Sequence, residues 1–284
     1  MRSPVRENCT QGSVSERSGN WPAHLDSKRN MKPLSMTFDK NAGEYRRYRP
    51  GYPTAIAEKV VSILGLHKSC RILEIGCGAG QATNIFSDLS PTQVCIDPGE
   101  KLLDECRACH DNMQRYSFEC SSFEGYEDNP ASFDLVYAAT CFHWLKPGFR
   151  FRKAAWLLKE NGGLAVFTNR HTKKKEGFFS EVQSVYQTIA PELVPSTPSM
   201  PMDEAAVEDN PLGLFHQAAY DREIKYTSEE YVGLLRTFSD HIALGERRLN
   251  ELCNGVHILI EKRYGGSISK TLTTSLAIYG NAQR

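Results

Sequence analysis

The sequence predicts an α/β protein: a Rossmann-like, seven-stranded, mostly parallel sheet with helices on both faces and an antiparallel last strand. Three observations predict this fold. Short apolar segments alternate with helical segments of about ten to fifteen residues, as in βαβ units. A glycine-rich segment, "LEIGCGAG" (73–80), follows the first apolar strand. The chain has 284 residues, of which 40% are apolar, so it is long enough to bury a large core.

The first half of the chain is expected to supply five strands and the helices between them. The strands are expected at 70–76, 92–97, 116–123, 132–144 and 163–169. Apolar spacing predicts helices at 54–66, 81–89, 99–110 and 146–163, with a cap at Thr54 for the first and at Asn161-Gly162 for the last. In such a sheet, ligands bind beyond the carboxyl ends of the strands.

The second half is expected to close the sheet and cover one side of the site. Helices are expected at 176–190, 228–242 and 246–266, strands at 218–227 and 267–280, and a proline-rich loop at 191–211. Residues 1–35 are polar and without periodicity, so we expect a disordered tail. Residues 36–284 are expected to form one domain: a lid at 36–55, a cofactor-binding core at 56–170, and acceptor-side helices and closing strands at 171–284.

Composition narrows the class of function. Acidic and basic residues number 34 each, which argues against a nucleic-acid partner, because such proteins carry a basic excess. No apolar run is long enough to suggest a membrane span. Nine cysteines without an evident secretory signal indicate reduced thiols and a cytoplasmic protein. The sequence does not predict an oligomeric state.

The glycine spacing separates the candidate ligands. Gly76, Gly78 and Gly80 are spaced G-x-G-x-G, whereas dinucleotide binding needs G-x-G-x-x-G, and Gln81 stands at that last position. Glu74 would repel a pyrophosphate but suits a positively charged ligand. Asp97 ends the next strand, where an acid can accept hydrogen bonds from both ribose hydroxyls. Together these features favour a nucleoside with a cationic amino-acid tail, S-adenosylmethionine.

These segments resemble a known family. "LEIGCGAG" followed by "CIDPG" resembles the motif pair of class I S-adenosylmethionine-dependent methyltransferases. "YRRYRPGYP" (45–53) and "ATCFHW" (139–144) are similar to the type 11 and trans-aconitate methyltransferase-like group, over about residues 38–169. The resemblance implies an enzyme that transfers a methyl group to a small-molecule acceptor.

The resemblance also implies residue roles. The cofactor-binding residues that it implies are Tyr45, Arg49, Glu74, Gly76, Gly78, Gly80, Asp97, Pro98, Ser122, Phe123 and Thr140. Tyr45 and Arg49 resemble lid residues, with the arginine meeting the methionyl carboxylate. Many relatives place an aspartate at the adenine contact, where this chain has Ser121-Ser122.

The acceptor site is predicted less directly. Tyr52, His143, Trp144 and Arg170 are the candidate substrate-binding residues. His143 is the candidate catalytic base, because its pKa lies near neutrality; the other interpretation, which we favour, makes His143-Trp144 a packing pair. His171 is a second histidine with two interpretations, a place in the acceptor pocket or a loop position, and we favour the loop. "CRACH" (106–110) matches a haem-attachment signature, but neither haem nor any other metal site is expected, because the segment falls on a helix without a second cysteine pair.

Methyl transfer from a sulfonium requires alignment more than acid–base chemistry. An acceptor hydroxyl or amine would need a base, whereas a carboxylate or a thiolate would need only positioning. The favoured function is O-directed transfer, with a carboxylate as one candidate acceptor. N- or S-directed transfer, and a non-catalytic cofactor-binding partner protein, remain as alternatives. Nucleic-acid methylation is disfavoured, because the chain lacks the N/D-P-P-Y/F signature at the end of the fourth strand.

Overall fold

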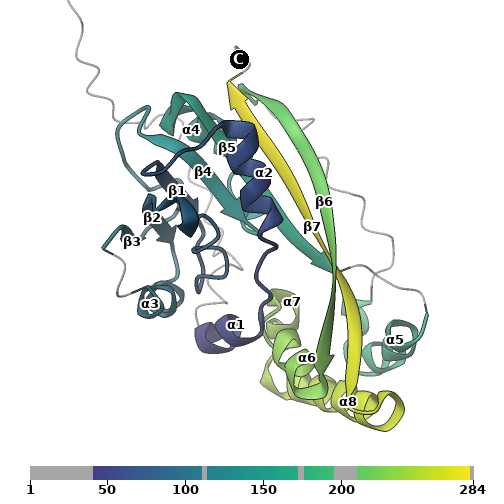
Figure 1. Cartoon of the computed structure of the whole chain (residues 1–284). Coiled ribbons are helices and arrows are strands. Elements are labelled where there is room, and N and C mark those ends of the chain that lie inside the picture. The colour runs from purple at the N-terminus through teal and green to yellow at the C-terminus, as the bar shows by residue number, and fades with distance from the viewer. Residues whose placement is uncertain (1–40, 111–113, 172–175, 195–209, 282–284) are drawn as a thin grey trace, which may run out of the picture.

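A computed structural model gives the fold (Figure 1). It describes residues 41–110, 114–171, 176–194 and 210–281. The predicted tail at 1–35, the first residues of the predicted lid and most of the proline-rich loop lie outside these ranges.

The predicted sheet is confirmed. Seven strands lie in the order β3-β2-β1-β4-β5-β7-β6. They are β1 (Arg71–Ile75), β2 (Thr92–Asp97), β3 (Tyr116–Cys120), β4 (Phe133–Ala139), β5 (Leu158–His171), β6 (Leu212–Thr227) and β7 (Ser267–Asn281). Neighbours from β3 to β5 are parallel, whereas β7 is antiparallel to both β5 and β6. Only the last strand of the chain therefore runs against the others, as the sequence predicts.

Helices cover both faces of the sheet because alternate strand residues point to opposite faces. Ile72 and Leu135 belong to a cluster with α2 (Ala55–Leu64), whereas Leu73 and Val136 belong to a cluster with α4 (Arg150–Leu157). Further along the sheet, α3 (Glu100–Ala108) packs against β2 and β3. The parallel strands are thus buried on both sides, which explains their nearly continuous apolar sequence.

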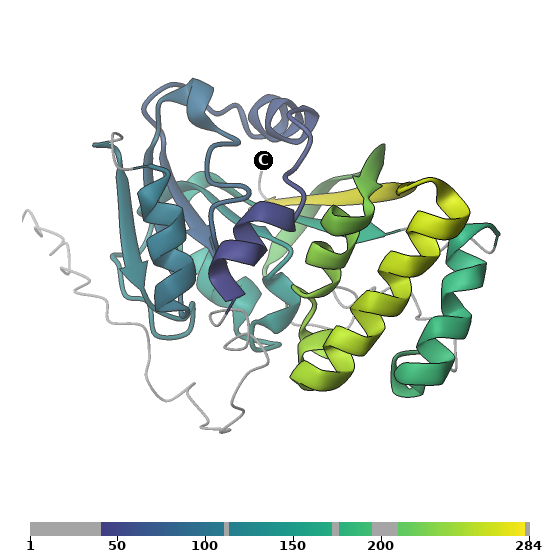
Figure 2. The same ribbon diagram turned by 90° about the horizontal axis from the view of Figure 1, so that it is seen from below.

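The second half of the chain builds a helical cluster at one end of β6 and β7 (Figure 1). Its members are α5 (Phe178–Ile189), α6 (Ser228–Leu235), α7 (Ser239–Ile242) and α8 (Glu246–Tyr264). Figure 2 shows α8 between α5 and α6, in agreement with their contacts. A separate apolar core holds this cluster together.

The short helix α1 (Ala42–Tyr48) connects the two halves. It contacts α3 on one side and α6 on the other. At α6, Gly233 leaves room for the Tyr48 ring: a Cβ at Gly233 would lie 2.5 Å from ring atoms of Tyr48. The predicted lid is thereby packed onto the helical cluster.

Several predicted elements are wrong in detail. Residues 81–89 form turns and a short 3₁₀ helix, η3 (Ser87–Leu89), in place of the expected helix. Thr54 already has helical dihedral angles and makes no side-chain cap bond. The helix that was expected to reach Asn161-Gly162 ends at Leu157, because these residues belong to β5. A Cβ at Gly162 would lie 2.9 Å from the Phe133 carbonyl oxygen, so this glycine permits close strand packing.

The remaining helical elements are short. The segment 228–242 forms two helices, α6 and α7, where one was expected. Two further 3₁₀ helices are η4 (Phe142–Trp144) and η5 (Pro191–Leu193). Among the described residues, no helix combines the length and the apolar character needed to cross a bilayer.

Candidate functional site

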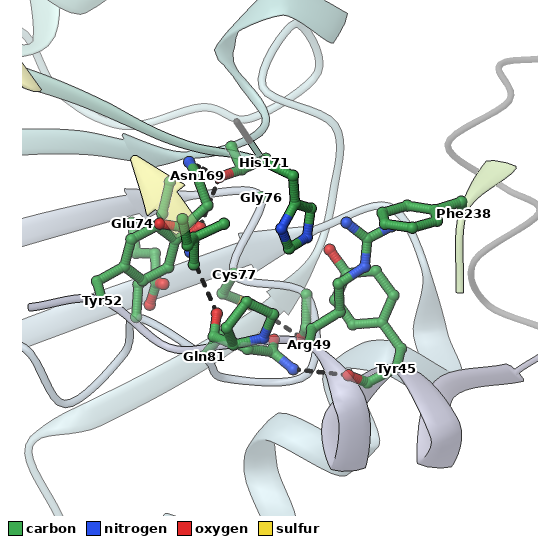
Figure 3. Close-up of a pocket in the computed structure, with 16 residues that line it drawn as sticks. Tyr45, Arg49, Tyr52, Glu74, Gly76, Cys77, Gln81, Asn169, His171 and Phe238 are labelled. Carbon is green, nitrogen blue, oxygen red and sulfur yellow. Dashed lines mark hydrogen bonds between the residues drawn. The ribbon is translucent and has the colours of Figure 1, made fainter. Parts of the chain in front are cut away.

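A pocket lies where β1, β4 and β5 end, beneath the segment that follows α1 (Figure 3). Its space, including the open mouth, is about 580 Å³. Its lining residues are Tyr45, Arg49, Pro50, Tyr52, Glu74, Gly76, Cys77, Gly78, Gln81, Ala82, Ala139, Thr140, Asn169, His171, Phe238 and Leu272. The ends of β1, β4 and β5 are therefore the wall of an actual cavity, whereas Asp97 at the end of β2 does not line it.

The glycine segment wraps the end of β1 in left-handed turns. Gly76, Gly78 and Gly80 have φ values of +62°, +55° and +92°. A non-glycine residue in this region costs about 1–2 kcal/mol. A Cβ at Gly76 would lie 2.8 Å from the Cys141 side chain, and one at Gly80 would lie 3.2 Å from Cys106 Sγ. Gly76 and Gly78 line the pocket, whereas the Cβ position of Gly80 faces α3.

Glu74 is fully buried and lines the pocket. Its Oε2 accepts a hydrogen bond from Gln93 Nε2 at 3.1 Å. Its Oε1 is buried without a hydrogen-bond partner. Burial raises the pKa of this carboxyl to about 8, and the nearby Cys106 adds to the shift. A buried carboxyl with an unpartnered oxygen is costly unless a cation or donor joins it.

Asp97 fastens the glycine segment to the end of β2. Its Oδ2 accepts from the Gly78 amide at 2.9 Å, and its Oδ1 accepts from the Gly99 amide at 2.8 Å. The side chain is 8% exposed. The predicted acid therefore lies against the predicted loop, and it also fixes the shape of that loop.

The lid residues Tyr45 and Arg49 close the pocket on one side (Figure 3). The Arg49 guanidinium lies over the Phe238 ring, with its Cζ 4.5 Å from the ring centroid, and 5.0 Å from the centroid of Tyr45. It also donates to Thr237 Oγ1 and to the Thr237 carbonyl, both at 2.8 Å. The arginine thus joins the lid to the helical cluster while facing the pocket.

A hydrogen-bonded chain crosses the floor of the pocket. Tyr52 Oη and Thr140 Oγ1 lie 2.7 Å apart, and Thr140 Oγ1 accepts from the Asn169 amide at 3.1 Å. Thr140 has a φ of +58°, an uncommon conformation for a non-glycine residue. Burial raises the pKa of the Tyr52 hydroxyl, so Tyr52 stays protonated. These bonds hold two predicted site residues, Tyr52 and Thr140, in fixed positions.

His171 ends β5 and lines the pocket. Its ring points into the space beside Arg49 and Phe238 (Figure 3). Burial and the positive charges of Lys270 and Arg49 lower its pKa to about 3, so the imidazole is neutral. Its Nδ1 atom is buried without a hydrogen-bond partner. The favoured expectation of a loop histidine is therefore wrong, because His171 belongs to β5 and lines this pocket.

Other predicted residues lie outside this pocket. Pro98 and Ser122 are exposed, and Phe123 is buried in the apolar core with α4. His143 and Trp144 lie on η4 as exposed neighbours, with their ring centroids 4.9 Å apart.

Arg170 is also exposed and does not line the pocket. It precedes His171 on β5 and follows Asn169, and both of those residues line the pocket. Because strand residues alternate, the Arg170 side chain points to the opposite face.

Sequence reasoning missed several lining residues. Asn169 donates from Nδ2 to the carbonyls of Pro50 and Gly51, both at 3.2 Å, and so holds the lid to β5. It is the last residue of the strand expected at 163–169, so the argument from strand ends could have found it. Phe238 and Leu272 come from the second half of the chain, where no local pattern marks them.

The "CRACH" segment has a structural role in the described structure. His110 is buried and its Nδ1 lies 2.6 Å from the Cys106 carbonyl oxygen, while Cys109 Sγ donates to the Glu105 carbonyl. Among the described residues, the group close enough to share a metal ion is Glu229, His257 and Glu261, which does not line the pocket.

Comparisons with known proteins agree with this geometry. Residues 72–162 match the family model for a methyltransferase domain. An uncharacterised methyltransferase of Schizosaccharomyces pombe is 27% identical over 137 residues, which cover 48% of this chain and 53% of that protein. A malonyl-[acyl-carrier protein] O-methyltransferase of Acetivibrio thermocellus is 31% identical over 164 residues, which cover 55% of this chain and 54% of the other. The chain thus matches about half the length of these curated relatives.

A solved structure supports the fold over a longer stretch. A protein of Anaeromyxobacter dehalogenans, assigned as a type II methyltransferase, aligns with a TM-score of 0.57 at 20% identity. The alignment covers 82% of this chain and 98% of that protein. The family match, the glycine segment and the order of the strands in the sheet all agree. Residues 72–162 form a methyltransferase domain of class I, the S-adenosylmethionine-dependent class.

Proposed function

We propose that the protein binds S-adenosylmethionine in this pocket and transfers its methyl group to a small-molecule acceptor. The observation that carries the proposal is the buried Glu74 Oε1, which lacks a partner beside the glycine segment. A cationic ammonium would satisfy this carboxylate, whereas a phosphate would be repelled by it.

The remaining cofactor contacts follow from the same placement. Arg49 would meet the methionyl carboxylate. Asp97 does not line the pocket but adjoins it through its bond to the Gly78 amide, and from there it would accept from the ribose hydroxyls. Pro98 and Ser122 are exposed near the end of β2 and β3, where they are proposed to border the adenine. The Phe123 ring is buried in the apolar core, so we propose that Phe123 contacts the adenine through its backbone.

The cofactor supplies an electrophilic methyl group on a sulfonium, whose departure leaves a neutral thioether. The role of the protein in this reaction is to orient the acceptor and to exclude water. Tyr52 and Thr140 are fixed by their mutual hydrogen bond, and Tyr45 closes the cavity. A carboxylate oxygen attacking the methyl carbon needs no base, since it forms a neutral ester with no proton to remove.

A carboxylate acceptor is favoured by the charges around His171. The charges of Lys270 and Arg49 both act on this histidine, and burial lowers the pKa of Lys270 to about 8. Because Arg49 is proposed to meet the methionyl carboxylate, Lys270 is the cation left for the acceptor; it does not itself line the pocket, and its Nζ donates to Tyr231 Oη at 3.3 Å. A cation near a partly buried site attracts an anion. The relative from Acetivibrio thermocellus is named as an O-methyltransferase, which points in the same direction. N- or S-directed transfer has no comparable support in the pocket.

His143, Trp144 and Arg170 keep their proposed role only if the acceptor extends beyond the pocket. A carboxylate acceptor makes a base at His143 unnecessary.

The eight described cysteines are all unbridged, which supports the proposed cytoplasmic location.

Calorimetry with S-adenosylmethionine tests the binding step. We expect one site per chain, weakened by Glu74→Gln, while Glu58→Gln on the exposed face of α2 binds as the unchanged protein does. Absence of binding would refute the proposal. A screen of radiolabelled methyl transfer into small-molecule pools tests the second step, and binding without any transfer would favour the non-catalytic alternative.

A further inference from the structure

We infer that His171 is the residue that selects the acceptor, and that the acceptor carries an uncharged hydrogen-bonding group, a hydroxyl or an amide, beside the carboxylate that is methylated. This inference rests on the proposed function and narrows its substrate class. It starts from a polar atom in the pocket that the cofactor does not account for.

The position of His171 separates it from the proposed cofactor contacts. Glu74 lies on β1 and Thr140 follows β4, while His171 ends β5, and these strands are successive neighbours in the sheet. Thr140, which is proposed to border the transferring methyl group, therefore lies between the cofactor side and His171. The ring of His171 also meets Phe238 edge to face, with centroids 6.2 Å apart, on the side of the helical cluster.

The unpartnered Nδ1 indicates that the site is completed by a ligand. Most buried polar atoms in folded proteins have a hydrogen-bond partner, so a buried ring nitrogen without one needs an explanation. Nδ1 is buried, and two neighbours of this histidine, the Phe238 ring and Leu272 opposite it on β7, have side chains that offer it no hydrogen bond. A polar group of a bound acceptor would supply the missing bond.

The charge of the surroundings determines which group fits. Burial, together with the charges of Lys270 and Arg49, keeps the imidazole neutral, and these charges disfavour an ammonium on the acceptor. Because Lys270 suits the carboxylate, the neutral imidazole is left to contact an uncharged group. A hydroxyl or an amide can pair with either tautomer of the ring.

Two substitutions test this assignment in the full chain. His171→Leu removes the polar atom at similar volume, whereas His171→Asn retains a polar atom near the position of Nδ1. His67→Leu is the matched control, because His67 is exposed near the start of β1, at the opposite end of the strands. The probes are small carboxylic acids in pairs that differ by one hydroxyl, such as malate and succinate, or salicylate and benzoate.

For the unchanged protein, we expect the hydroxylated acid of each pair to have a KM about ten-fold below that of the acid without the hydroxyl. This ratio is the one expected when a single hydrogen bond is gained. His171→Leu should abolish this preference, His171→Asn should restore part of it, and His67→Leu should retain it. Affinity for S-adenosylhomocysteine should be unchanged in all three variants.

Three results would overturn the inference. The first is a preference for the hydroxylated acid that persists in His171→Leu. The second is an unchanged protein that methylates both members of every pair equally, or that methylates neither member. The third is weaker S-adenosylhomocysteine binding by His171→Leu. The last result would place Nδ1 against the cofactor. Failure of the unchanged protein to bind S-adenosylmethionine at all is a separate outcome, which refutes the proposed function itself.

Discussion

At the scale of single residues, we expect Glu74 to link cofactor binding to proton release. Its pKa of about 8 means that the carboxyl is mostly protonated at pH 7 in the ligand-free protein. An ammonium placed beside it favours the carboxylate. Binding of S-adenosylmethionine at pH 7 should therefore release up to about one proton, seen as a binding enthalpy that differs between phosphate and Tris buffers. Glu74→Gln should bind without buffer dependence, and an equal dependence in both proteins would contradict the assignment.

The same carboxyl makes stability depend on pH. Its folded-state pKa lies above its ordinary value of 4.5, so the folded protein holds more protons than the unfolded chain between about pH 5 and 8. The contribution of Glu74 to the free energy of unfolding is fully present below pH 4.5 and declines as the pH rises through 8. Urea denaturation at pH 6 and pH 8 should show a smaller decline for Glu74→Gln than for the unchanged protein. An identical decline would mean that Glu74 does not titrate in this window.

Asp97 serves the loop and the proposed ribose contact together. Asp97→Ala removes the acceptor for the Gly78 and Gly99 amides as well as the proposed bonds to the ribose. We expect a loss of about 1–3 kcal/mol in binding free energy for S-adenosylhomocysteine. Asp97→Asn keeps one carbonyl acceptor and should lose less. Calorimetry that gives equal affinity for Asp97→Ala and the unchanged protein would exclude the ribose assignment.

At the scale of elements, α1 connects the helical cluster to the pocket, since it packs on α6 and carries Tyr45 of the pocket lining. Gly233 on α6 does not line the pocket, yet it accommodates the Tyr48 ring. Gly233→Ala should displace α1 and destabilise the fold by about 1–3 kcal/mol, the usual cost of overpacking. It should also weaken S-adenosylhomocysteine binding, because Tyr45 and Arg49 move with the lid.

Gly43→Ala, also in a helix, is the matched control for this prediction. A Cβ at Gly43 on α1 would meet its nearest neighbour, Glu105 Oε1, at an ordinary 3.8 Å. Calorimetry and thermal unfolding of both variants separate the effects. Destabilisation by Gly233→Ala with unchanged affinity would show that α1 does not control the pocket.

The elements also show what sequence can predict. Strands such as β1 and β4 are continuous apolar runs buried on both faces, so composition alone identifies them. The glycine segment is predictable because its three positive φ values require glycine. The expected helix at 81–89 fails because helical propensity does not reveal that this segment turns around the end of β1.

Prediction of the site is limited by distance along the chain. Glu74, Asp97 and Thr140 end strands, and their shared position follows from the topology of a parallel sheet. His171 and Asn169 follow the same rule on β5, but Phe238 reaches the pocket only through packing of the helical cluster. Arg170 was predicted from its charge, yet strand alternation gives the pocket positions to its two neighbours.

At the scale of the whole molecule, the two halves are continuous. One sheet runs from β3 to β6, so β5 and β7 join the cofactor-binding strands to the strands of the second half. Arg49 adds a link from the lid to Thr237, between α6 and α7. These connections favour the proposed single domain over two independent ones, because neither half can open without breaking sheet hydrogen bonds.

Cofactor binding should therefore stabilise the whole domain. A ligand at about 100 times its Kd adds about 2.7 kcal/mol to the free energy of unfolding, and for a domain of this size each kcal/mol raises Tm by about 2–4 °C. We expect S-adenosylhomocysteine to raise Tm by about 5–10 °C in a single calorimetric transition. Far-UV circular dichroism, which reports helices of both halves, should give the same midpoint. Asp97→Ala should show a smaller shift at the same ligand concentration. Two transitions, of which the ligand raises only one, would show instead that the helical cluster unfolds independently of the site.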